Sequence, residues 1–595
     1  MEHPTRPPGG DGESEDAVPV PDAGTPRPSH LLLRDDAARW TTAAPTHTVL
    51  GVVHNVTSAT RLLDLLAPLE GDSRVQVVFA CTGSSAFEGG IREFAAARQL
   101  PCISWEEAKR HKFDLAVSSS RGGELQEINA PLVGAPHGAG YNKYLRREPG
   151  AGSREPEAGS RKPEAFGLDA EWLTHDGRLI PSAVVLSHDE QRERLRRGCP
   201  EAVPVSVVAG DPCMDRLRAS LPFREEYRAA FGVRPGGRLV VITSTWGRHS
   251  LLGANMDVVR RALAELPADG YRVVAAVHPN VWFGHGGWQL RSWLAPHIRA
   301  GLVVPAPETD AWQAALVAAD AFVGDHGSLT LYGAALGVPG LLGAFGEEAV
   351  AAGSPMERLG SALPRVRAHE PLEEQVLRAT AAQPGDARLA EIGRLVTSRP
   401  MRAAALLRRL YYARMELDEP EEPAVARPVA LPLPLPVERY EPAAPAMFVT
   451  AAVAGAGHSR RVSVRRYPAA LQGSVTGHLP DPHLVVSEGE PDPRWCHAAD
   501  VVVARRPGPP ERLFRAYPGC WVVAAPDGEA GCVAYVRDGW RVTARWEDAG
   551  LSVEVAASVL FAVLAGGDGG GDGAVEVDAV EGTDPVRLRL TEVCP

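Results

Sequence analysis

The sequence lacks the charge balance and the cysteine pattern of several large classes of protein. Acidic residues outnumber lysine and arginine, and the net charge is -12 over 595 residues. A general nucleic-acid binder or anionic-membrane binder needs clustered basic residues, so we expect neither partner. The eight cysteines are scattered without a CxxC pair. They indicate reduced, mostly core residues of a cytosolic protein and lack metal-ligand spacing.

Long apolar segments are also missing. Residues 1–24 are acidic and proline-rich and lack the apolar core of a signal peptide. Only residues 551–567 approach the length of a membrane span, and this short run contains Glu554. We therefore predict a cytoplasmic location and no integral membrane segment.

Common catalytic signatures are absent as well. There is no GxGxxG, no GxxxxGK[ST] and no GxSxG turn at a strand end, so hydride transfer, P-loop hydrolysis and serine hydrolysis lack support. No run of paired acidic residues at a strand end marks a Mg²⁺ site. We expect neither a metal nor a cofactor.

The composition is that of a globular protein with several domains. Hydrophobic residues make up 45% of the chain and charged residues 23%. A chain of this length is too long for a single core, so two or three domains are expected. Residues 1–30 are predicted to be a disordered tail.

Residues 31–210 are predicted to form a Rossmann-like first domain. Strand-like runs alternate with helical segments, which is typical of a parallel sheet covered by helices. A near-duplicate, GSREPEA and GSRKPEA, indicates a flexible insertion at residues 148–164. The expected strands are 47–54, 74–80, 113–118, 131–136, 182–188 and 204–210, and the expected helices are 58–69 (capped by Thr57 or Ser58) and 86–99.

Residues 211–415 are predicted to form a second Rossmann-like domain that ends in a helical stretch, 373–415. The fold class is therefore α/β, with two doubly wound domains in tandem. Their facing strand ends leave a cleft suited to a substrate with two halves. The expected strands are 238–244, 272–278, 302–304 and 321–323.

The rest of the chain is predicted to be a linker and a third domain. Residues 416–445, with EPEEP and LPLPLP, indicate an acidic, proline-rich linker. Residues 446–595 are expected to form an accessory α/β domain of unknown role that folds separately and is dispensable for nucleotide binding. Its expected strands are 448–453, 501–504, 521–524 and 575–577, and its expected helix is 551–564.

The most informative segment is ADAFVGDHGSLTLYGAALGVPGLL, residues 319–342. It predicts a strand, a polar turn at Asp325, His326 and Gly327, a helix and a second strand. Such a turn lies at the carboxyl end of its strand, where ligands bind in open α/β sheets. Free N–H groups at the helix start favour an anion, and the hydroxyls of Ser328 and Thr330 add hydrogen bonds. We interpret it as a diphosphate cradle, although Asp325 could equally cap the helix.

Other polar residues follow predicted strands in both domains. His137 precedes Gly138, which allows a close approach to the backbone, and its imidazole can accept a proton from an attacking hydroxyl. A structural or capping histidine is an equal alternative. Arg248 could bind a phosphate bidentately or could simply be solvated. His278 could donate to a phosphate oxygen or a leaving group.

The order of these motifs resembles the GT-B fold, and within it the CDP-glycerol:polyol-phosphate glycerophosphotransferases of teichoic-acid synthesis. The HG…K motif of that family is matched by His137, Gly138 and Lys143, with Asn142 in place of part of its TPLK sequence. The hinge is loosely matched by Gly210-Asp211-Pro212 with Asp215, the PTWR turn by residues 244–248, the HP motif by His278-Pro279, and the DYSS turn by residues 325–328.

The resemblance implies a bacterial transferase that uses a nucleotide-diphosphate donor, CDP- or UDP-linked, and a hydroxyl acceptor. It implies that His137 is the base, and that His278, Ser328 and Thr330 bind the diphosphate together with Arg248 and the turn Asp325-His326-Gly327. Gly138, Asn142 and Lys143 fall on the acceptor side. Two alternatives stay open: a non-catalytic binding or regulatory protein on an inactive GT-B scaffold, and an enzyme like the UDP-sugar 2-epimerases.

Overall fold

The computed structural model describes residues 42–85, 89–144, 164–432, 445–455, 460–472, 479–537, 539–546, 551–566, 573–578 and 585–593. The predicted tail, nearly all of the predicted insertion and the second half of the predicted linker lie outside these residues. Residues 45–595 belong to one compact unit. No helix in the described ranges is long and apolar enough to span a bilayer.

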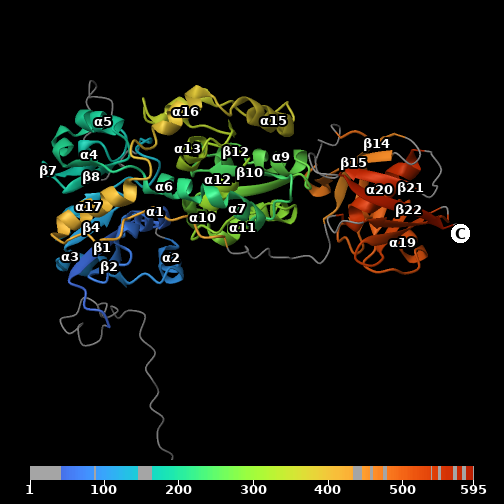
Figure 1. Cartoon of the computed structure of the whole chain (residues 1–595), viewed down its shortest axis with the longest axis horizontal. Helices are drawn as coiled ribbons and strands as arrows, with labels where there is room; N and C mark the ends of the chain where they lie inside the picture. The colour runs from blue at the N-terminus through green and yellow to red at the C-terminus, as the bar shows by residue number, and fades with distance from the viewer. Residues whose placement is uncertain are drawn as a thin grey trace, which may run out of the picture. The chain divides into compact units, whose positions relative to one another are not determined.

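The first sheet has seven parallel strands in the order β3-β2-β1-β4-β5-β8-β9 (Figure 1). The short edge strand β3 is the one strand of this sheet that the sequence pattern missed. The strands are β1 His47–Val53, β2 Val75–Cys81, β3 Cys102–Ile103, β4 Leu115–Ser118, β5 Leu132–Gly134, β8 Ala183–Leu186 and β9 Ser206–Val208, and a small hairpin joins β6 Thr174–His175 to β7 Arg178–Leu179.

The helices around this sheet begin at well-formed caps. The first, α1, starts earlier than predicted, because Asn55 rather than Thr57 or Ser58 is the N-cap and forms a capping box with Ser58. The helices are α1 Val56–Leu66, α2 Ile91–Ala97, α3 Trp105–Arg110, α4 Ala170–Leu173 and α5 Glu190–Gly198, with 3-10 turns at Ala67–Leu69, Leu125–Glu127 and Pro200–Val205.

The second sheet is also parallel, in the order β11-β10-β12-β13. Single parallel bridges at Val303 and Arg365 extend it on both edges, so the predicted strand 302–304 appears only as a bridge. The strands are β10 Arg238–Ser244, β11 Tyr271–Val277, β12 Ala321–Gly324 and β13 Gly340–Leu342.

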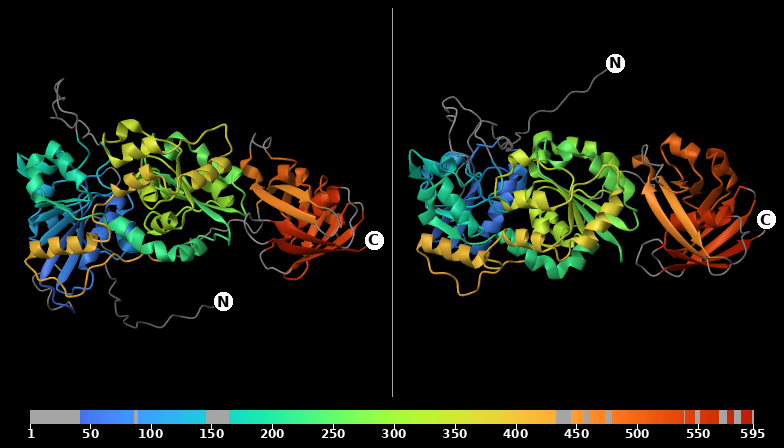
Figure 2. Two further views of the ribbon diagram at one scale, coloured as in Figure 1. Left: turned by 45° about the horizontal axis from the view of Figure 1, so that its top comes forward. Right: turned by 90° about the horizontal axis from the view of Figure 1, so that it is seen from above.

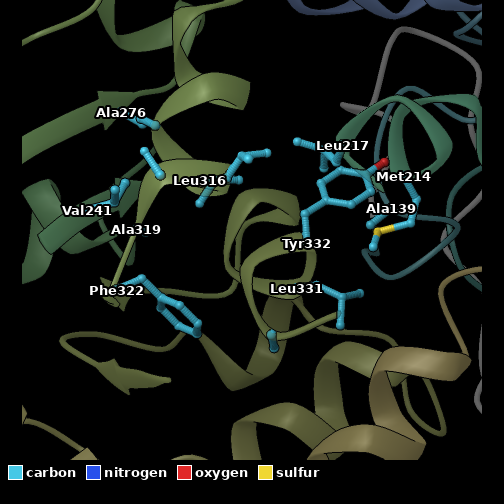
Figure 3. Close-up of a cluster of buried hydrophobic side chains, with 14 of the residues drawn as sticks. Ala139, Met214, Leu217, Val241, Ala276, Leu316, Ala319, Phe322, Leu331 and Tyr332 are labelled. Atoms are coloured by element: carbon cyan, nitrogen blue, oxygen red, sulfur yellow. The ribbon is translucent and has the colours of Figure 1, made fainter. Parts of the chain in front are cut away.

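Side chains that alternate along β10 enter two separate cores, one on each face of the second sheet. Val241 packs with Phe322 and with helices α12 and α13, as Figure 3 shows, whereas Val240 and Ile242 pack on the opposite face with α9 and α11. The prediction of two parallel sheets covered by helices is therefore confirmed. The helices are α6 Pro212–Ser220, α7 Arg224–Ala230, α8 Leu251–Ala254, α9 Asp257–Glu265, α10 Pro279–His285, α11 Gly287–Arg299, α12 Ala311–Ala318, α13 Ser328–Ala335, α14 Pro355–Ala362, α15 Leu372–Ala382, α16 Ala387–Arg394 and α17 Ala403–Met415, with 3-10 turns at Leu221–Phe223 and Glu347–Ala349.

The chain returns to the first sheet after α16. Helix α17, assigned by sequence to the second domain, packs its Leu407 and Tyr411 into the core of the first (Figure 1). The following segment packs against the second domain, because Tyr227 Oη donates to the Val429 carbonyl and the Val429 N–H donates to Ser220 Oγ. The first half of the predicted linker is thus held along both domains.

The third part of the chain differs from the prediction. Its nine strands form a mixed sheet that closes on itself, visible in orange and red in Figure 2, where the sequence pattern gave only four strands. Two of the missed strands, β20 and β22, alternate arginine with apolar residues, so half of each strand reads as polar, whereas the missed strands β16 and β19 contain no arginine. The strands are β14 Met447–Ala454, β15 Arg460–Pro468, β16 His483–Ser487, β17 Val501–Val503, β18 Val522–Pro526, β19 Gly531–Val536, β20 Arg541–Trp546, β21 Gly573–Asp578 and β22 Val586–Val593, and the helices are α18 Pro493–Ala498, α19 Glu511–Ala516 and α20 Val553–Ala565, with a 3-10 turn at Ala469–Leu471.

Helix α20 fills this closed sheet. Residues 555–560 are all buried and belong to one core with the strands, as expected for a helix that is apolar on every side.

A buried ion pair joins the third part to the second domain. Arg466 on β15 donates to both oxygens of Asp269 at 2.6 and 2.7 Å, and the Asp269 side chain is only 2% exposed. Burial would raise the pKa of Asp269, but Arg466 and a second partner, Arg234 at 2.8 Å, outweigh it and the pKa is lowered. Gln472 also donates to the Ala264 carbonyl.

We expect Arg466→Ala to lower the free energy of unfolding by about 2 kcal/mol, because the buried Asp269 loses two hydrogen bonds from a charged donor and keeps only Arg234, at 2.8 Å, as its counter-ion. Urea denaturation at neutral pH measures this. The lowered pKa of Asp269 means that the contribution is complete above the unfolded carboxyl pKa of about 4 and is lost as the pH falls further. Arg461→Ala, exposed on the same strand, is the control. Equal effects of the two variants would contradict the anchoring role of Arg466.

Candidate functional site

A cavity of about 650 Å³ lies between the carboxyl ends of the two parallel sheets. Both sheets contribute at their topological switch points, the crevices where the strand order reverses. In the first sheet this crevice lies between β1 and β4, and in the second between β10 and β12. The residues that follow these strands and line the cavity are His54 and Asn55, Ser119 to Gly123, Thr245 and Trp246, and Asp325 to Ser328.

Contacts on one side of the cavity hold the two domains together. Lys143 Nζ donates to Thr245 Oγ1 at 2.9 Å. The Tyr144 N–H donates to the Ala349 carbonyl at 3.0 Å, and the Ala351 N–H donates to the Asn142 carbonyl at 2.8 Å. The turn after His137 is therefore fixed to the second domain by both its backbone and a side chain.

An ionic cluster joins the domains elsewhere. Arg216 on α6 bridges Asp64 on α1 at 2.9 Å and Asp310 before α12 at 3.1 Å. Arg98, which follows α2, also pairs with Asp310 at 3.1 Å. Two helices and two positions that flank helices thus share one set of charges.

The turn that starts α13 is shaped by Asp325. Its carboxylate accepts hydrogen bonds from the backbone N–H groups of Thr245, Leu251 and Gly327, each at 2.8 Å. The side chain is fully buried, so Asp325 organises the turn and has its acceptors engaged by the backbone. Burial raises its pKa. The expectation that Asp325 caps the helix or binds the diphosphate gives way to this bracing role.

Ser328 stands at the first position of α13. The N-cap Gly327 provides no side-chain cap, so the first N–H groups of the helix are directed into the cavity without a capping acceptor from this residue. A Cβ on Gly327 would lie 3.0 Å from Asp325 Oδ1 and 3.1 Å from Thr245 Cβ, which explains why glycine occupies the turn. Gly327 and Ser328 thus line the cavity where the sequence predicts a diphosphate cradle.

Two of the predicted diphosphate ligands lie elsewhere. Thr330 is fully buried, and its hydroxyl bonds to Thr243 Oγ1 at 2.9 Å and accepts from the Asp325 N–H at 3.2 Å, below the turn rather than in the cavity. Arg248 is exposed and donates to His249 Nε2 at 2.7 Å. The chain turns at Gly247, with φ of +87°, and carries Arg248 away from the lining residues.

His278 and His326 are held as neutral hydrogen-bond donors. His278 Nδ1 accepts from the Asn280 N–H at 3.1 Å, and His326 Nδ1 accepts from the Gly346 N–H at 3.1 Å. A backbone N–H can only donate, so in each ring the proton is on Nε2. Burial lowers the pKa of His326 to about 4 and the pKa of His278 well below its usual value.

His137 has the opposite tautomer. Its Nδ1 lies 3.2 Å from the Ser119 carbonyl, which can only accept, so Nδ1 carries the proton and Nε2 keeps its lone pair. Burial is the main cause that lowers the pKa of His137 to about 4, and the positive charges of Lys143, Arg61 and Arg121 act in the same direction. The ring is a neutral base at neutral pH.

The three predicted acceptor-side residues line the cavity beside His137. Gly138 lies so close to the second domain that a Cβ there would be 2.4 Å from Ser328 Oγ. Asn142 donates to the Ala139 carbonyl. Burial lowers the pKa of Lys143, and the nearby Asp325 opposes that effect.

The cavity is cationic although the chain is acidic. Its lining among the described residues includes Arg61, Arg121 and Lys143 but only one carboxylate, Asp325. No group of histidine, cysteine and acidic residues in the described ranges could hold a metal ion. His54 and Arg121 were missed in the sequence, although His54 is the last residue of the predicted strand 47–54 and Arg121 lies three residues after the predicted strand 113–118.

Comparisons with known proteins give structural likeness only. No protein-family model and no curated protein sequence matches the chain. Solved structures do match, and they include the group that the motifs resemble. A wall teichoic acid polymerase TagF soaked with CDPG aligns with a TM-score of 0.41 and 10% identity over 65% of this chain and 92% of that chain.

Glycosyltransferase structures match at a similar level. One from Rickettsia africae has a TM-score of 0.35 and 11% identity over 63% of this chain and all of that chain (100%). Anabaena HepE in complex with UDP-glucose has a TM-score of 0.35 and 11% identity over 62% of this chain and 99% of that chain. Likeness at this level does not decide a function, so we rely on the residues of the cavity.

We expect Gly138→Ala to destabilise the protein by about 1 kcal/mol, because the added methyl group collides with Ser328 Oγ across the cavity and the hydroxyl must rotate away. Adding Ser328→Gly removes the colliding atom and should restore most of the loss, a coupling that a double-mutant cycle of unfolding free energies measures. Gly508→Ala, where a Cβ meets nothing within 4 Å, is the control. Additive effects of the two substitutions would show that the turns are not in contact.

Proposed function

We propose that the chain is a transferase of the GT-B type, which moves a glycosyl or glycerophosphate group from a nucleotide-diphosphate donor to a hydroxyl acceptor. The observation that carries the proposal is that two neutral histidines with opposite tautomers line one cavity. His278 presents an N–H and His137 presents a lone pair. A leaving group that gains negative charge and an acceptor hydroxyl that loses a proton need these two opposite functions.

The donor diphosphate is placed against the second domain. The N–H groups at the start of α13 and the Ser328 hydroxyl can bind phosphate oxygens. Lys143 Nζ and His278 Nε2–H lie on the same cavity and add a charge and a donor. These groups can neutralise a diphosphate by hydrogen bonds and charge, so a metal ion is not required by the proposal.

The transfer step follows from this placement. His137 Nε2 accepts the proton of the acceptor hydroxyl while the oxygen attacks the transferred group. For a glycosyl donor the bond from the anomeric carbon to the diphosphate oxygen breaks, and nucleoside diphosphate leaves. For a glycerophosphate donor the bond between the two phosphates breaks, and nucleoside monophosphate leaves. The groups around Ser328 stabilise the charge on either leaving group.

Calorimetric titration of the full chain with CDP and UDP tests the donor-binding half of the proposal. We expect at least one nucleotide to bind, and Ser328→Ala to weaken it by about tenfold, because a hydrogen bond to a charged group is lost. Arg248→Ala is the matched control, since this arginine lies outside the cavity, and should leave the affinity unchanged. Failure of every nucleoside diphosphate to bind, or a greater loss in Arg248→Ala, would contradict the proposal.

Release of nucleotide from a panel of CDP- and UDP-linked donors tests the chemistry. We expect His137→Ala to lower the rate by about 10²–10⁴-fold with nearly unchanged nucleotide affinity, because only proton transfer is lost. Since the pKa of His137 is about 4, the wild-type rate should be independent of pH above about pH 5 and fall as Nε2 becomes protonated.

The same assay separates the alternatives. Tight nucleotide binding without turnover of any donor would favour the non-catalytic binding protein. Conversion of a UDP-sugar to its epimer without an acceptor would favour a 2-epimerase-like enzyme.

A further inference from the structure

The first-domain half of the cavity contains polar groups that the proposed transfer step does not use. They belong to Arg121, His54 and Asn142, all of which line the cavity. Each is more than nine-tenths buried, with exposed fractions of 5%, 2% and 8%. Each also has one polar atom that finds no hydrogen-bond partner among the described residues.

Arg121 is a buried cation without a counter-ion. Its guanidinium donates to the carbonyls of Ser120 and Ala135 and to Tyr141 Oη at 3.3–3.4 Å, while Nε has no partner among the described residues. None of the carboxylates in the described ranges forms an ion pair with it. A buried charge that is neither paired nor fully hydrogen-bonded is costly. An anion bound in the cavity removes that cost.

His54 and Asn142 supply acceptors that lack donors. His54 Nε2 lies 2.6 Å from the Gly122 carbonyl, so Nε2 carries the proton and the unpartnered Nδ1 is a lone pair. Asn142 uses its amide N–H on Ala139, which leaves Oδ1 without a partner among the described residues. Both atoms are buried beneath the surface of the cavity, so we assign neither of them to the ligand.

An aromatic wall stands beside the base. The Phe166 ring centroid is 6.0 Å from that of His137, and the Trp172 ring packs edge-on against Phe166 at 4.6 Å. Both rings line the cavity. The C–H face of a sugar ring packs against such a surface, whereas a linear polyol presents no flat face of this kind.

We propose that this half of the cavity binds the acceptor, and that the acceptor is a sugar ring carrying an anionic group, either a carboxylate or a phosphate. The assignment as an acceptor rests on the proposed function, because it takes His137 as the base. The anionic group pairs with Arg121, and the ring packs on Phe166 and Trp172.

The test uses the full chain with four probes: glucose, glucuronate, glucose 6-phosphate and glycerol 3-phosphate. Ligand-observed NMR titration gives their dissociation constants with and without UDP. We expect at least one of the two acidic sugars to bind about tenfold or more tightly than glucose, as a charge-assisted pair requires. The tighter of the two identifies the anionic group. Equal binding of glucose and both acidic sugars overturns the proposal, and so does glycerol 3-phosphate binding as tightly as the acidic sugars.

Variants assign the effect to residues. Arg121→Gln should abolish the preference for the acidic sugar, and Arg121→Lys should retain part of it. Trp172→Leu should weaken the binding of glucose and of the acidic sugar alike, by about tenfold, while the preference for the acidic sugar persists. Arg248→Gln is the control arginine. If Arg121→Gln does not fold, the wild-type preference and the Arg121→Lys variant still decide the outcome. A preference that survives Arg121→Gln overturns the assignment.

The two proposals fail separately. Ser328→Ala should weaken the binding of UDP without changing the affinity for the acidic sugar. A chain that prefers the acidic sugar but binds no nucleotide would retain the sugar site and reject the transferase. A chain that binds nucleotide but shows no preference among the sugars would retain the transferase and reject the acidic acceptor.

Discussion

Three backbone N–H groups, from Thr245, Leu251 and Gly327, converge on the carboxylate of Asp325 in the interior of the second domain. The bonds connect the loop after β10 to the turn after β12, the two strands that flank the switch point. They leave the start of α13 pointing into the cavity and place Thr245 where Lys143 can reach it. A carboxylate with this many backbone donors is difficult to replace, because each orphaned N–H would be buried. The geometry of the second-domain half of the cavity depends on this carboxylate.

Burial lowers the pKa of the histidines that line the cavity, whereas it raises the pKa of Asp325. It keeps His54, His137, His278 and His326 neutral, because an imidazolium would lose its hydration. Each ring is then fixed in one tautomer by a backbone partner that is either strictly a donor or strictly an acceptor. The backbone therefore decides which histidine offers a proton and which can take one. Histidine can thus act as a proton donor at one position of the cavity and as a proton acceptor at another.

The sequence predicted the strands of both parallel sheets well, because each is a continuous apolar run with turn residues behind it. It also placed His137, His278 and Ser328 at strand ends, which meet at one edge of a parallel sheet. It could not predict which of two nearby hydroxyls enters the cavity, since the orientation of Ser328 and Thr330 depends on the helix phase at the turn. Nor could it predict that Gly247 carries Arg248 outward. Strands β20 and β22 of the closed sheet were missed because they alternate arginine with apolar residues.

Net charge is a poor guide to the site for a related reason. The net charge of the chain is -12, yet the charged side chains that line the cavity, among the described residues, are three cations and one carboxylate that is hydrogen-bonded to the backbone. Surface charges interact through water and are screened beyond about 8 Å at physiological ionic strength. Charges in the partly buried cavity act through a medium of lower dielectric constant and are screened far less. An acidic protein can therefore contain a cationic cavity, because the nearby, partly buried groups rather than the net charge set the potential inside it.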